Sequence, residues 1–233
     1  MRSGVASRRE ADRLIAAGAV LVDGRRPPPT GTLIDPESAS VTVDGRAVRP
    51  LLGHRHLALH KPVGVMVTES DPEGRPTVAD LLRAHGEQRR LMAVGRLDYD
   101  SSGLLLLTDD GELAHRLTHP RYGVPKEYLA VVRGMPDERD LRRLRDGVPL
   151  EDGVTAPAEA EVVDRAAGGA VVRLVLTEGR NREVRRMLEA VGHPARELAR
   201  TSFGPIKLGR LRAGDLHRLR EPEVRALRQA VGL

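Results

Sequence analysis

The chain has 233 residues, no cysteine, one Phe and three Tyr, and its 38 Lys and Arg against 33 Asp and Glu give a formal charge of +5. The lack of cysteine excludes disulfide scaffolds, thiol nucleophiles and cysteine-ligated zinc or iron–sulfur sites, and the few aromatic residues disfavour a stacking platform of several rings. No apolar run approaches the ~18 residues of a membrane span, and no apolar signal segment is evident at the N-terminus. We therefore expect a cytoplasmic protein that has no membrane partner.

The first fifty residues predict a small unit with one helix and short strands. Its elements are a capping box at 7–10 that begins a helix ending before Gly18, and strands at 19–22 and 41–43, each followed by an Asp-Gly turn. We expect this unit to span residues 1–48 and a linker to span 49–55.

Residues 56–233 predict a larger unit in which strands and helices follow each other in mixed order. In chain order the predicted elements are strands at 56–60 and 65–68, a helix at 77–84, a strand at 104–108, a helix at 112–117 capped by Asp109, a strand at 127–133, a helix at 136–146, strands at 160–163 and 171–177, a helix from Asn181 to Val191, a strand at 197–203 and a helix at 222–231. The apolar run Leu104–Leu107 predicts a strand that is buried on both faces. Mixed order with few long crossovers favours an α+β fold over a doubly wound parallel sheet.

Positive charge is concentrated in one segment, because residues 173–212 contain ten basic and four acidic residues. Such clustering is typical of proteins that bind a phosphate backbone, since each neutralised phosphate releases counterions. A solvated helix face is the alternative that the pattern leaves open.

The sequence lacks the P-loop pattern, the dinucleotide pattern G-x-G-x-x-G and the hydrolase pattern G-x-S-x-G. Carboxylate chemistry remains, in the segment Gly-Arg-Leu-Asp-Tyr-Asp-Ser-Ser-Gly at 95–103, directly before the apolar strand. An aspartate against an apolar strand keeps its charge only beside a cation, which Arg96 and the arginines after Asn181 offer. An ionised carboxylate paired with arginine is a candidate nucleophile or base, and a structural Asp–Arg pair is the alternative.

Several ordered motifs resemble the signature of the RsuA/RluB-type pseudouridine synthases. They are Gly-Arg-Leu-Asp at 95–98, Ser-x-Gly-Leu-Leu-Leu-Leu-Thr at 101–108, Asp-Gly-Glu-Leu at 110–113, Lys-Pro-x-Gly at 61–64, Lys-x-Tyr at 126–128 and Glu-Gly-Arg-Asn-Arg-Glu-Val-Arg-Arg-Met at 178–187. Residues 6–9 and 22–24 resemble an S4 RNA-binding domain, which this family carries ahead of its catalytic domain. The resemblance implies an S4-like domain, followed at 56–233 by a catalytic domain with a mixed, mostly antiparallel sheet flanked by helices. In this family a further helix usually precedes the segment that matches residues 6–9, so either the start of the chain is trimmed or the S4-like domain is incomplete.

The resemblance further implies an enzyme that isomerises a specific uridine of ribosomal RNA to pseudouridine without cofactor or metal. General similarity favours the 23S RNA of the large subunit, and we expect a monomer. By motif position Asp98 matches the catalytic aspartate, Tyr128 the tyrosine that stacks on the everted base, Arg185 the basic residue that pairs with Asp98, and Leu176 the apolar residue lining the pocket. The residues predicted to contact RNA or the everted nucleotide are Arg96, Lys61, Lys126, Arg180, Arg182, Arg186, Arg8 and Arg9.

Two other functions stay open at this point. The first is a metal-dependent RNA phosphoesterase with Asp98, Asp100, Asp109 and Asp110 around Mg²⁺. The second is a non-enzymatic S4-type ribosome-binding factor, in which Asp98 and Arg185 form only a structural pair.

Overall fold

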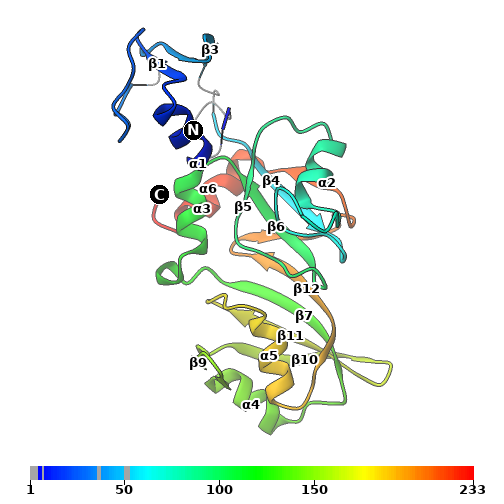
Figure 1. Ribbon diagram of the computed structural model, residues 1–233. Helices are drawn as coiled ribbons and strands as arrows, with labels where there is room; N and C mark the ends of the chain where they lie inside the picture. Colours follow the sequence, from blue (N-terminus) through cyan, green and yellow to red (C-terminus); the bar gives the residue numbers. More distant parts are fainter. Residues whose placement is uncertain (1–4, 7, 36–37, 50–52) are drawn as a thin grey trace. The chain divides into compact units, whose positions relative to one another are not determined.

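The computed structural model describes residues 5–6, 8–35, 38–49 and 53–233, and the chain divides into two compact units, 1–54 and 55–233 (Figure 1). No helix in the described ranges is long and apolar enough to cross a membrane.

The described residues of the first unit form one helix and a three-stranded antiparallel sheet. Its elements are α1 (Arg8–Ala16), β1 (Val20–Val22), β2 (Val41–Val43) and β3 (Arg46–Val48), and the strands pair in that order. The turn between β2 and β3 places Asp44 and Gly45 at φ of 47° and 73°, the left-handed conformation that a two-residue hairpin needs to match the strand twist. The helix and the two strands predicted here are confirmed, whereas Ser7 of the predicted capping box lies outside the described residues.

The second unit is built on a mixed sheet. Its strands are β4 (His56–Lys61), β5 (Met92–Ala93), β6 (Ser102–Thr108), β7 (Lys126–Arg133), β10 (Glu159–Ala166), β11 (Gly169–Leu176), β12 (Ala195–Phe203), β13 (Ile206–Lys207) and β14 (Leu216–Arg218). The order is β10-β11-β7-β12-β6-β4-β14, and β13 and β5 join at β12 and β6. Every pairing is antiparallel except that of β12 with β6. The predicted α+β fold with a mixed, mostly antiparallel sheet is confirmed.

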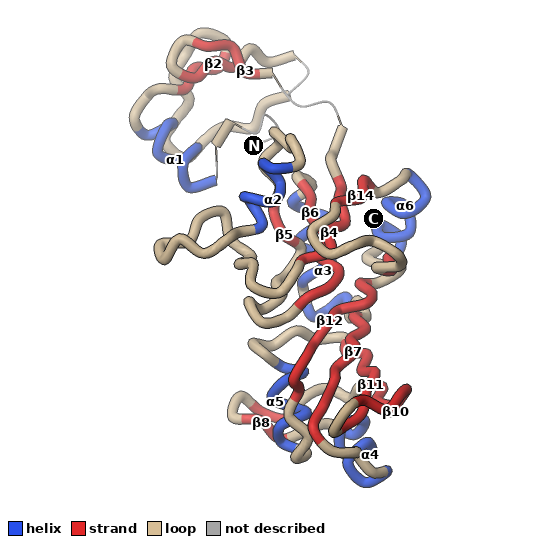
Figure 2. Tube along the Cα trace, turned by 90° about the vertical axis from the view of Figure 1, so that its right-hand side faces the viewer, coloured by secondary structure: helices blue, strands red, loops and turns tan. Residues whose placement is uncertain are grey.

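Helices cover this sheet in groups. They are α2 (Val78–Ala84), α3 (Gly111–Thr118), the 3₁₀ turn η1 (Pro120–Tyr122), α4 (Glu138–Asp146), α5 (Glu183–Ala190) and α6 (Glu221–Gln229). Apolar residues of α4 and α5 pack against β7, β10, β11 and β12, and these elements lie together at one end of the unit (Figures 1 and 2). Residues of α3 and α6 share a second core with β4 and β6, and residues of α2 share a third. A separate short hairpin of β8 (Pro149–Leu150) and β9 (Gly153–Val154) follows α4.

Strand β6 lies between two of these cores. Leu104 and Leu106 point to the core of α3 and α6, whereas Leu105 and Leu107 point to the core of α2. Since side chains alternate along a strand, a strand buried on both faces is apolar at every position. The prediction made from the run of four leucines is therefore confirmed.

Two predictions about the local structure between residues 65 and 110 are wrong. Residues 65–68 form no strand, because the backbone there makes only an isolated bridge from Met66 to Thr77. The cap of α3 is Asp110, whose Oδ1 accepts the Leu113 N–H at 3.1 Å. The carboxylate of Asp109 instead accepts the Arg55 N–H at 2.8 Å, which turns it away from the helix.

The parallel pairing of β6 with β12 brings together two segments that are far apart in the sequence. Strands β6 and β12 share only two registered pairs, Ala199 with Ser102 and Arg200 with Gly103. The loop that precedes β6 and the middle of β12 therefore meet at this junction.

Candidate active site

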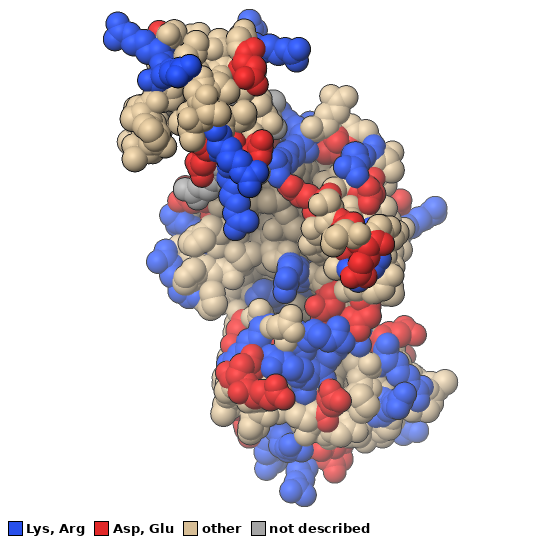
Figure 3. Space-filling model, viewed as in Figure 1, with Lys and Arg blue, Asp and Glu red and all other residues tan. Residues whose placement is uncertain are grey.

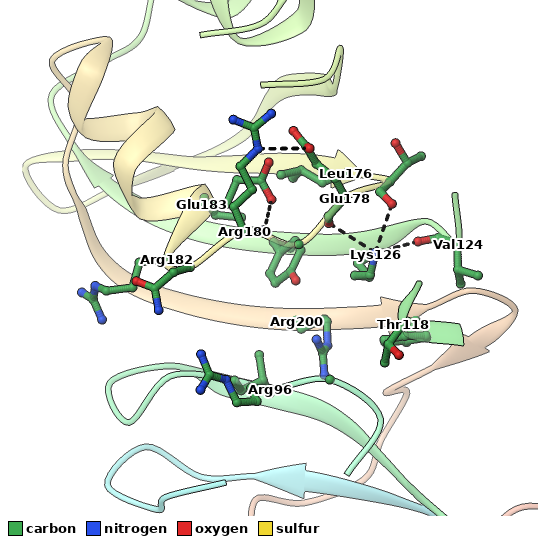
Figure 4. A pocket seen from close by; sticks show the side chains of 18 of the residues that line it. Arg96, Thr118, Val124, Lys126, Leu176, Glu178, Arg180, Arg182, Glu183 and Arg200 are labelled. Atoms are coloured by element: carbon green, nitrogen blue, oxygen red, sulfur yellow. Dashed lines mark hydrogen bonds and ion pairs between the residues drawn. The ribbon is translucent and has the colours of Figure 1, made fainter. Parts of the chain in front are cut away.

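A pocket of about 280 Å³ lies beside this junction. Its walls come from four segments: the loop before β6, the end of α3 through the start of β7, the end of β11 through the start of α5, and β12. Figure 4 shows side chains from all four segments around one hollow, among them Arg96, Thr118, Lys126, Leu176, Arg182 and Arg200. On the face drawn in Figure 3, basic side chains gather over the α5 end of the unit with acidic side chains at their border. The pocket is thus lined by both apolar and charged side chains.

Asp98 lies in the loop before β6 and lines this pocket, as its motif predicts. Buried neighbours on both sides hold the loop: Leu97 packs in the core of α2, and Ser101 is 1% exposed. The Ser101 N–H donates to the Asp98 carbonyl at 3.1 Å. The Asp98 side chain itself keeps 29% of its surface exposed, so its carboxylate is presented to the pocket from a fixed backbone.

The guanidinium nearest to Asp98 belongs to Arg182. Its Nη1 lies 3.8 Å from Oδ2 of Asp98, and its two terminal nitrogens donate to the two oxygens of Asp100 at 3.0 and 2.9 Å. The Arg182 hydrogen bonds hold the pKa of Asp100 below its ordinary value. Arg182 therefore bridges the two carboxylates of this loop.

The predicted pairing of Arg185 with Asp98 is wrong. Arg185 Nε lies 3.3 Å from Oδ2 of Asp100, and its Nη2 donates to the Asp100 backbone oxygen at 2.7 Å. Its Nη1 donates to the Ala195 carbonyl at 3.1 Å. The side chain, 11% exposed, thus lies between α5, β12 and the loop, where it holds the backbone that follows Asp98 rather than the Asp98 carboxylate.

The start of α5 explains this exchange of partners. The predicted cap, Asn181, is wrong: the N-cap is Arg182, which has the left-handed φ of 48° and makes no side-chain cap bond. The Arg180 N–H donates instead to Glu183 Oε2 at 2.9 Å. Because Arg182 precedes the helix in this conformation, its side chain does not follow the helical row of Arg186 and reaches the Asp98 loop.

Glu183 and Glu178 form a carboxyl pair at the pocket wall that sequence reasoning missed. Glu183 is 4% exposed, and its Oε1 is buried without a donor among the described residues. Burial, with the adjacent Glu178 carboxyl, raises the pKa of Glu183 to about 7. A protonated Glu183 carboxyl can donate to the adjacent Glu178 carboxylate. The only sequence signal is the spacing of two acids within an arginine-rich motif, which does not reveal burial.

Two predicted RNA contacts are engaged by the protein itself. Arg180 donates to the backbone oxygens of Gly153 and Val154 at 3.0 and 2.7 Å. Arg186 forms a two-pronged pair with Asp152, both bonds at 2.9 Å. Together they attach the β8–β9 hairpin to the region of α5, and their contact with RNA phosphates stays a prediction.

Lys61 does not lie on an RNA-facing surface, which corrects its predicted role. It is 0% exposed, and its Nζ donates to the backbone oxygens of Pro62 and Val65 at 2.8 and 2.9 Å. Burial lowers its pKa to about 8, against the opposing attraction of Asp98 and Asp100. Lys61 therefore stabilises the turn after β4, and its buried ammonium group lies near the loop that carries Asp98 and Asp100.

Lys126 lines the pocket, but its ammonium group is fully engaged. It donates to the carbonyls of Val124, Thr177 and Glu178 at 2.9, 3.3 and 3.2 Å, as the dashed lines of Figure 4 show. Burial lowers its pKa to about 8, and the positive charge of Arg200 adds to that effect. Since an ammonium has three donors, none remains for a phosphate while these three bonds persist.

Three further predicted residues meet in the same pocket. Tyr128 of β7 is half-buried and packs against the cores on both sides of the junction. Leu176, at the end of β11, is 4% exposed, and Arg96 is exposed at the rim. The structure therefore gathers Asp98, Tyr128, Leu176 and Arg96 around one cavity.

The pocket also contains Arg200, which sequence reasoning missed entirely. Arg200 is 2% exposed and its Nε donates to the Leu104 backbone oxygen at 2.8 Å. In the sequence it is one arginine among many in a basic segment, and nothing in the pattern distinguishes a buried arginine from an exposed one.

The remaining predicted residues lie elsewhere. Arg8 and Arg9 lie in α1 of the first unit, where the Arg9 side chain is exposed. The four aspartates considered for Mg²⁺ do not gather, since Asp109 binds Arg55 and Asp110 caps α3. Within the described part of the chain, no three His, Cys, Asp or Glu side chains form a group suited to a metal ion.

Comparisons with known proteins agree with this geometry. A family model described as RNA pseudouridylate synthase matches residues 55–190, and one described as S4 domain matches residues 2–26. An uncharacterized RNA pseudouridine synthase of Mycobacterium tuberculosis is 47% identical over 233 residues, covering 100% of this chain and 92% of the relative. The ribosomal large subunit pseudouridine synthase B of Bacillus subtilis is 41% identical, covering 97% and 92%. A crystal structure of a pseudouridylate synthase superposes with a TM-score of 0.69 at 28% identity, covering 97% of this chain and 95% of that one.

Proposed function

Because the chain belongs to the RNA pseudouridylate synthase family and is a pseudouridine synthase, we propose that it modifies a specific uridine of large-subunit ribosomal RNA and that Asp98 is its catalytic aspartate. The choice of RNA rests on relatives in Bacillus subtilis and Haemophilus influenzae that are named for the large subunit, at 41% and 44% identity.

The observation that carries the proposal is the surroundings of Asp98. Its carboxylate faces a pocket that also contains Tyr128 and Leu176, and a guanidinium lies 3.8 Å away. A base stacked in RNA is out of reach of any side chain, so the target uridine must be everted, at a free-energy cost of a few kcal/mol. Stacking on one aromatic ring returns about 1–3 kcal/mol, and Tyr128 is the aromatic side chain that the pocket offers beside Phe203.

Asp98 then acts on the ribose of the everted nucleotide. Either its carboxylate attacks C1′ or it removes the proton from C2′, and in both routes the bond between C1′ and N1 breaks. The freed uracil turns and its C5 bonds to C1′; in that step the Asp98–C1′ bond of the first route breaks, or the proton of the second route returns to C2′. The proton on C5 is then lost, and N1 gains one. In this scheme Arg182, rather than Arg185, supplies the positive charge beside the reacting carboxylate.

The first unit has a separate task in this proposal. The S4 match covers α1, with Arg8 and Arg9 on its first turn. We assign RNA binding to the unit of residues 1–54, with these arginines as phosphate contacts, and catalysis to residues 55–233.

The test is to map pseudouridines in the ribosomal RNA of a strain that lacks this gene, after rescue with different variants. We expect a missing pseudouridine to return with the wild-type protein and with Asp164→Asn, a matched change at an exposed aspartate of β10, but not with Asp98→Asn. Return of the modification with Asp98→Asn would remove the catalytic role from Asp98. Loss of a pseudouridine from small-subunit RNA instead would contradict the proposed substrate.

A further inference from the structure

Arg200 is a buried cation without an opposite charge. Its terminal nitrogens have no hydrogen-bond partner among the described residues, Nη2 is buried in that state, and no carboxylate of the described chain pairs with it. Besides Leu104, its guanidinium contacts the Phe203 ring at 5.1 Å from the centroid. An unpaired buried charge is strongly unfavourable. A ligand that brings electron-rich oxygen into the pocket would complete this site.

The register of the sheet places Arg200 beside the proposed base platform. Arg200 of β12 is directly opposite Tyr128 of β7, and the side chains of such a pair lie on the same face of a sheet with Cβ atoms about 4.5–5.5 Å apart. In Figure 4 Arg200 lies between the Arg182 end of the pocket and the Thr118 end. A base stacked on Tyr128 therefore has Arg200 within reach of its edge.

Two neighbouring cations already have partners within the protein. Lys126 donates its three N–H groups to backbone carbonyls. Arg182 donates hydrogen bonds to Asp100 and forms an ion pair with Asp98. The positive charge of Arg200 contributes to the lowered pKa of Lys126, which agrees with their proximity. Of these three cations, Arg200 has terminal donors to spare.

We infer that Arg200 donates a hydrogen bond to a carbonyl oxygen of the everted uracil and stabilises the negative charge that the ring carries when it leaves C1′; this rests on the proposed function. When the bond between C1′ and N1 breaks, its electron pair passes to the uracil ring and is shared by O2 and O4. Formation of the C1′–C5 bond returns that pair, and Arg200 neither gains nor loses a proton. A preorganised donor aimed at developing charge is among the largest contributions to catalysis.

The first test replaces the guanidinium with an apolar chain of similar length. We expect Arg200→Met to lower kcat on a large-subunit RNA transcript by roughly 100–1000-fold, the range for loss of one such donor, with KM changed far less. Its melting temperature should equal or exceed that of the wild type, because Met needs no counter-charge. Arg200→Lys, which keeps the charge, should lose less activity. The matched control is Arg196→Met on the same strand, where the guanidinium bonds only the backbone of Ala167 and Gly168.

A second readout separates this role from a structural one. Fluorine at C5 withdraws electrons and stabilises the uracil anion, so a transcript made with 5-fluorouridine should depend less on Arg200. For each transcript we compare the rate at which the target nucleotide is consumed by the wild type and by Arg200→Met. The factor by which Arg200→Met slows this rate should be at least about 10-fold smaller with 5-fluorouridine than with uridine, because the fluorinated ring needs less stabilisation as it leaves C1′. Equal factors on both transcripts would show that Arg200 acts only through structure.

The outcomes distinguish this inference from the proposed function. Near-normal kcat in Arg200→Met while Asp98→Asn is inactive overturns the role of Arg200 alone. Activity in Asp98→Asn on the same transcript overturns the assignment of Asp98. If Arg200→Met does not fold, the Arg200→Lys variant carries the comparison of the two transcripts, with the same expected direction.

Discussion

Gly103 of β6 and Arg200 of β12 approach so closely that a Cβ atom at Gly103 would lie 2.3 Å from the Arg200 backbone oxygen. Gly103 also has φ of 110°, a conformation that side chains disfavour. Strands β6 and β12 can therefore approach this closely beside the pocket only because residue 103 has no side chain.

Gly103→Ala should lower the free energy of unfolding by roughly 2–4 kcal/mol, because the new methyl group meets backbone that cannot move aside cheaply. Urea denaturation followed by circular dichroism measures this. Gly111→Ala at the start of α3 is the control: the nearest atom to its Cβ would be Met92 Cε at 3.9 Å, so its midpoint should stay near that of the wild type. Equal midpoints for the two variants would contradict the close approach.

Arg182 and Arg185 should differ in what their loss affects. Arg182 is 43% exposed and bonds only carboxylates, whereas Arg185 is 11% exposed and bonds two backbone oxygens. Arg182→Met should therefore lower kcat by about 10–100-fold with an unchanged melting temperature, since it removes charge beside Asp98. Arg185→Met should lower the melting temperature as well as activity. Single-turnover rates and thermal melts of both variants test this, and the reverse pattern would restore Arg185 as the partner of Asp98.

Much of the fold follows from local sequence patterns. Four leucines in a row at 104–107 predict a strand buried on both faces, and the Asp-Gly turn at 44–45 predicts the tight hairpin of the first unit. Asp109 and Asp110 show where such reasoning stops. Either residue suits a helix cap, and only the long-range bond from Arg55 to Asp109 decides between them.

The sequence motifs are enough to predict which residues line the pocket where each residue's position in its motif also fixes its place in the fold. Asp98, Tyr128 and Leu176 fall in the same pocket because each occupies a fixed place in a strand or loop. The partner of Asp98 was not predictable, since the left-handed backbone of Arg182 takes its side chain off the helical row. Arg200 was not predictable either, because burial of one arginine among many depends on packing between β6, β7 and β12.

The three lysines should differ in their reaction with acetic anhydride. Lys207 is exposed, Lys61 is fully buried, and Lys126 is partly buried in the pocket. The lowered pKa of about 8 at Lys61 and Lys126 leaves more of each as free amine than at an ordinary lysine, so slow labelling there reports burial and not protonation.

At about pH 8 we expect Lys207 to be acetylated first and Lys61 last, as followed by mass spectrometry of digested protein. Labelling in urea provides the control, since all three should react alike once the chain is unfolded. Acetylation of Lys61 at the rate of Lys207 in the folded protein would restore it as a surface contact for RNA.

Glu183→Gln should change how stability depends on pH. The pKa of Glu183 rises from 4.5 to about 7 on folding, so between these values the folded protein keeps a proton that the unfolded chain has lost. Wild-type stability therefore falls as pH rises through this window, and the loss is complete above the folded pKa. Glutamine imitates the protonated acid and does not titrate. The free energy of unfolding of Glu183→Gln relative to wild type should increase by roughly 1–3 kcal/mol from about pH 5 to about pH 8.

Urea titrations at several pH values measure this difference, and Glu189→Gln on the exposed side of α5 is the matched control. The control should follow the wild-type pH profile, because the Glu189 side chain is exposed and lies outside the pocket wall. Parallel profiles for Glu183→Gln and wild type would mean that Glu183 is ionised when folded. Glu178 and Glu183 would then repel each other, and a protonated carboxyl would not hold the loop that carries Arg182 to Asp98.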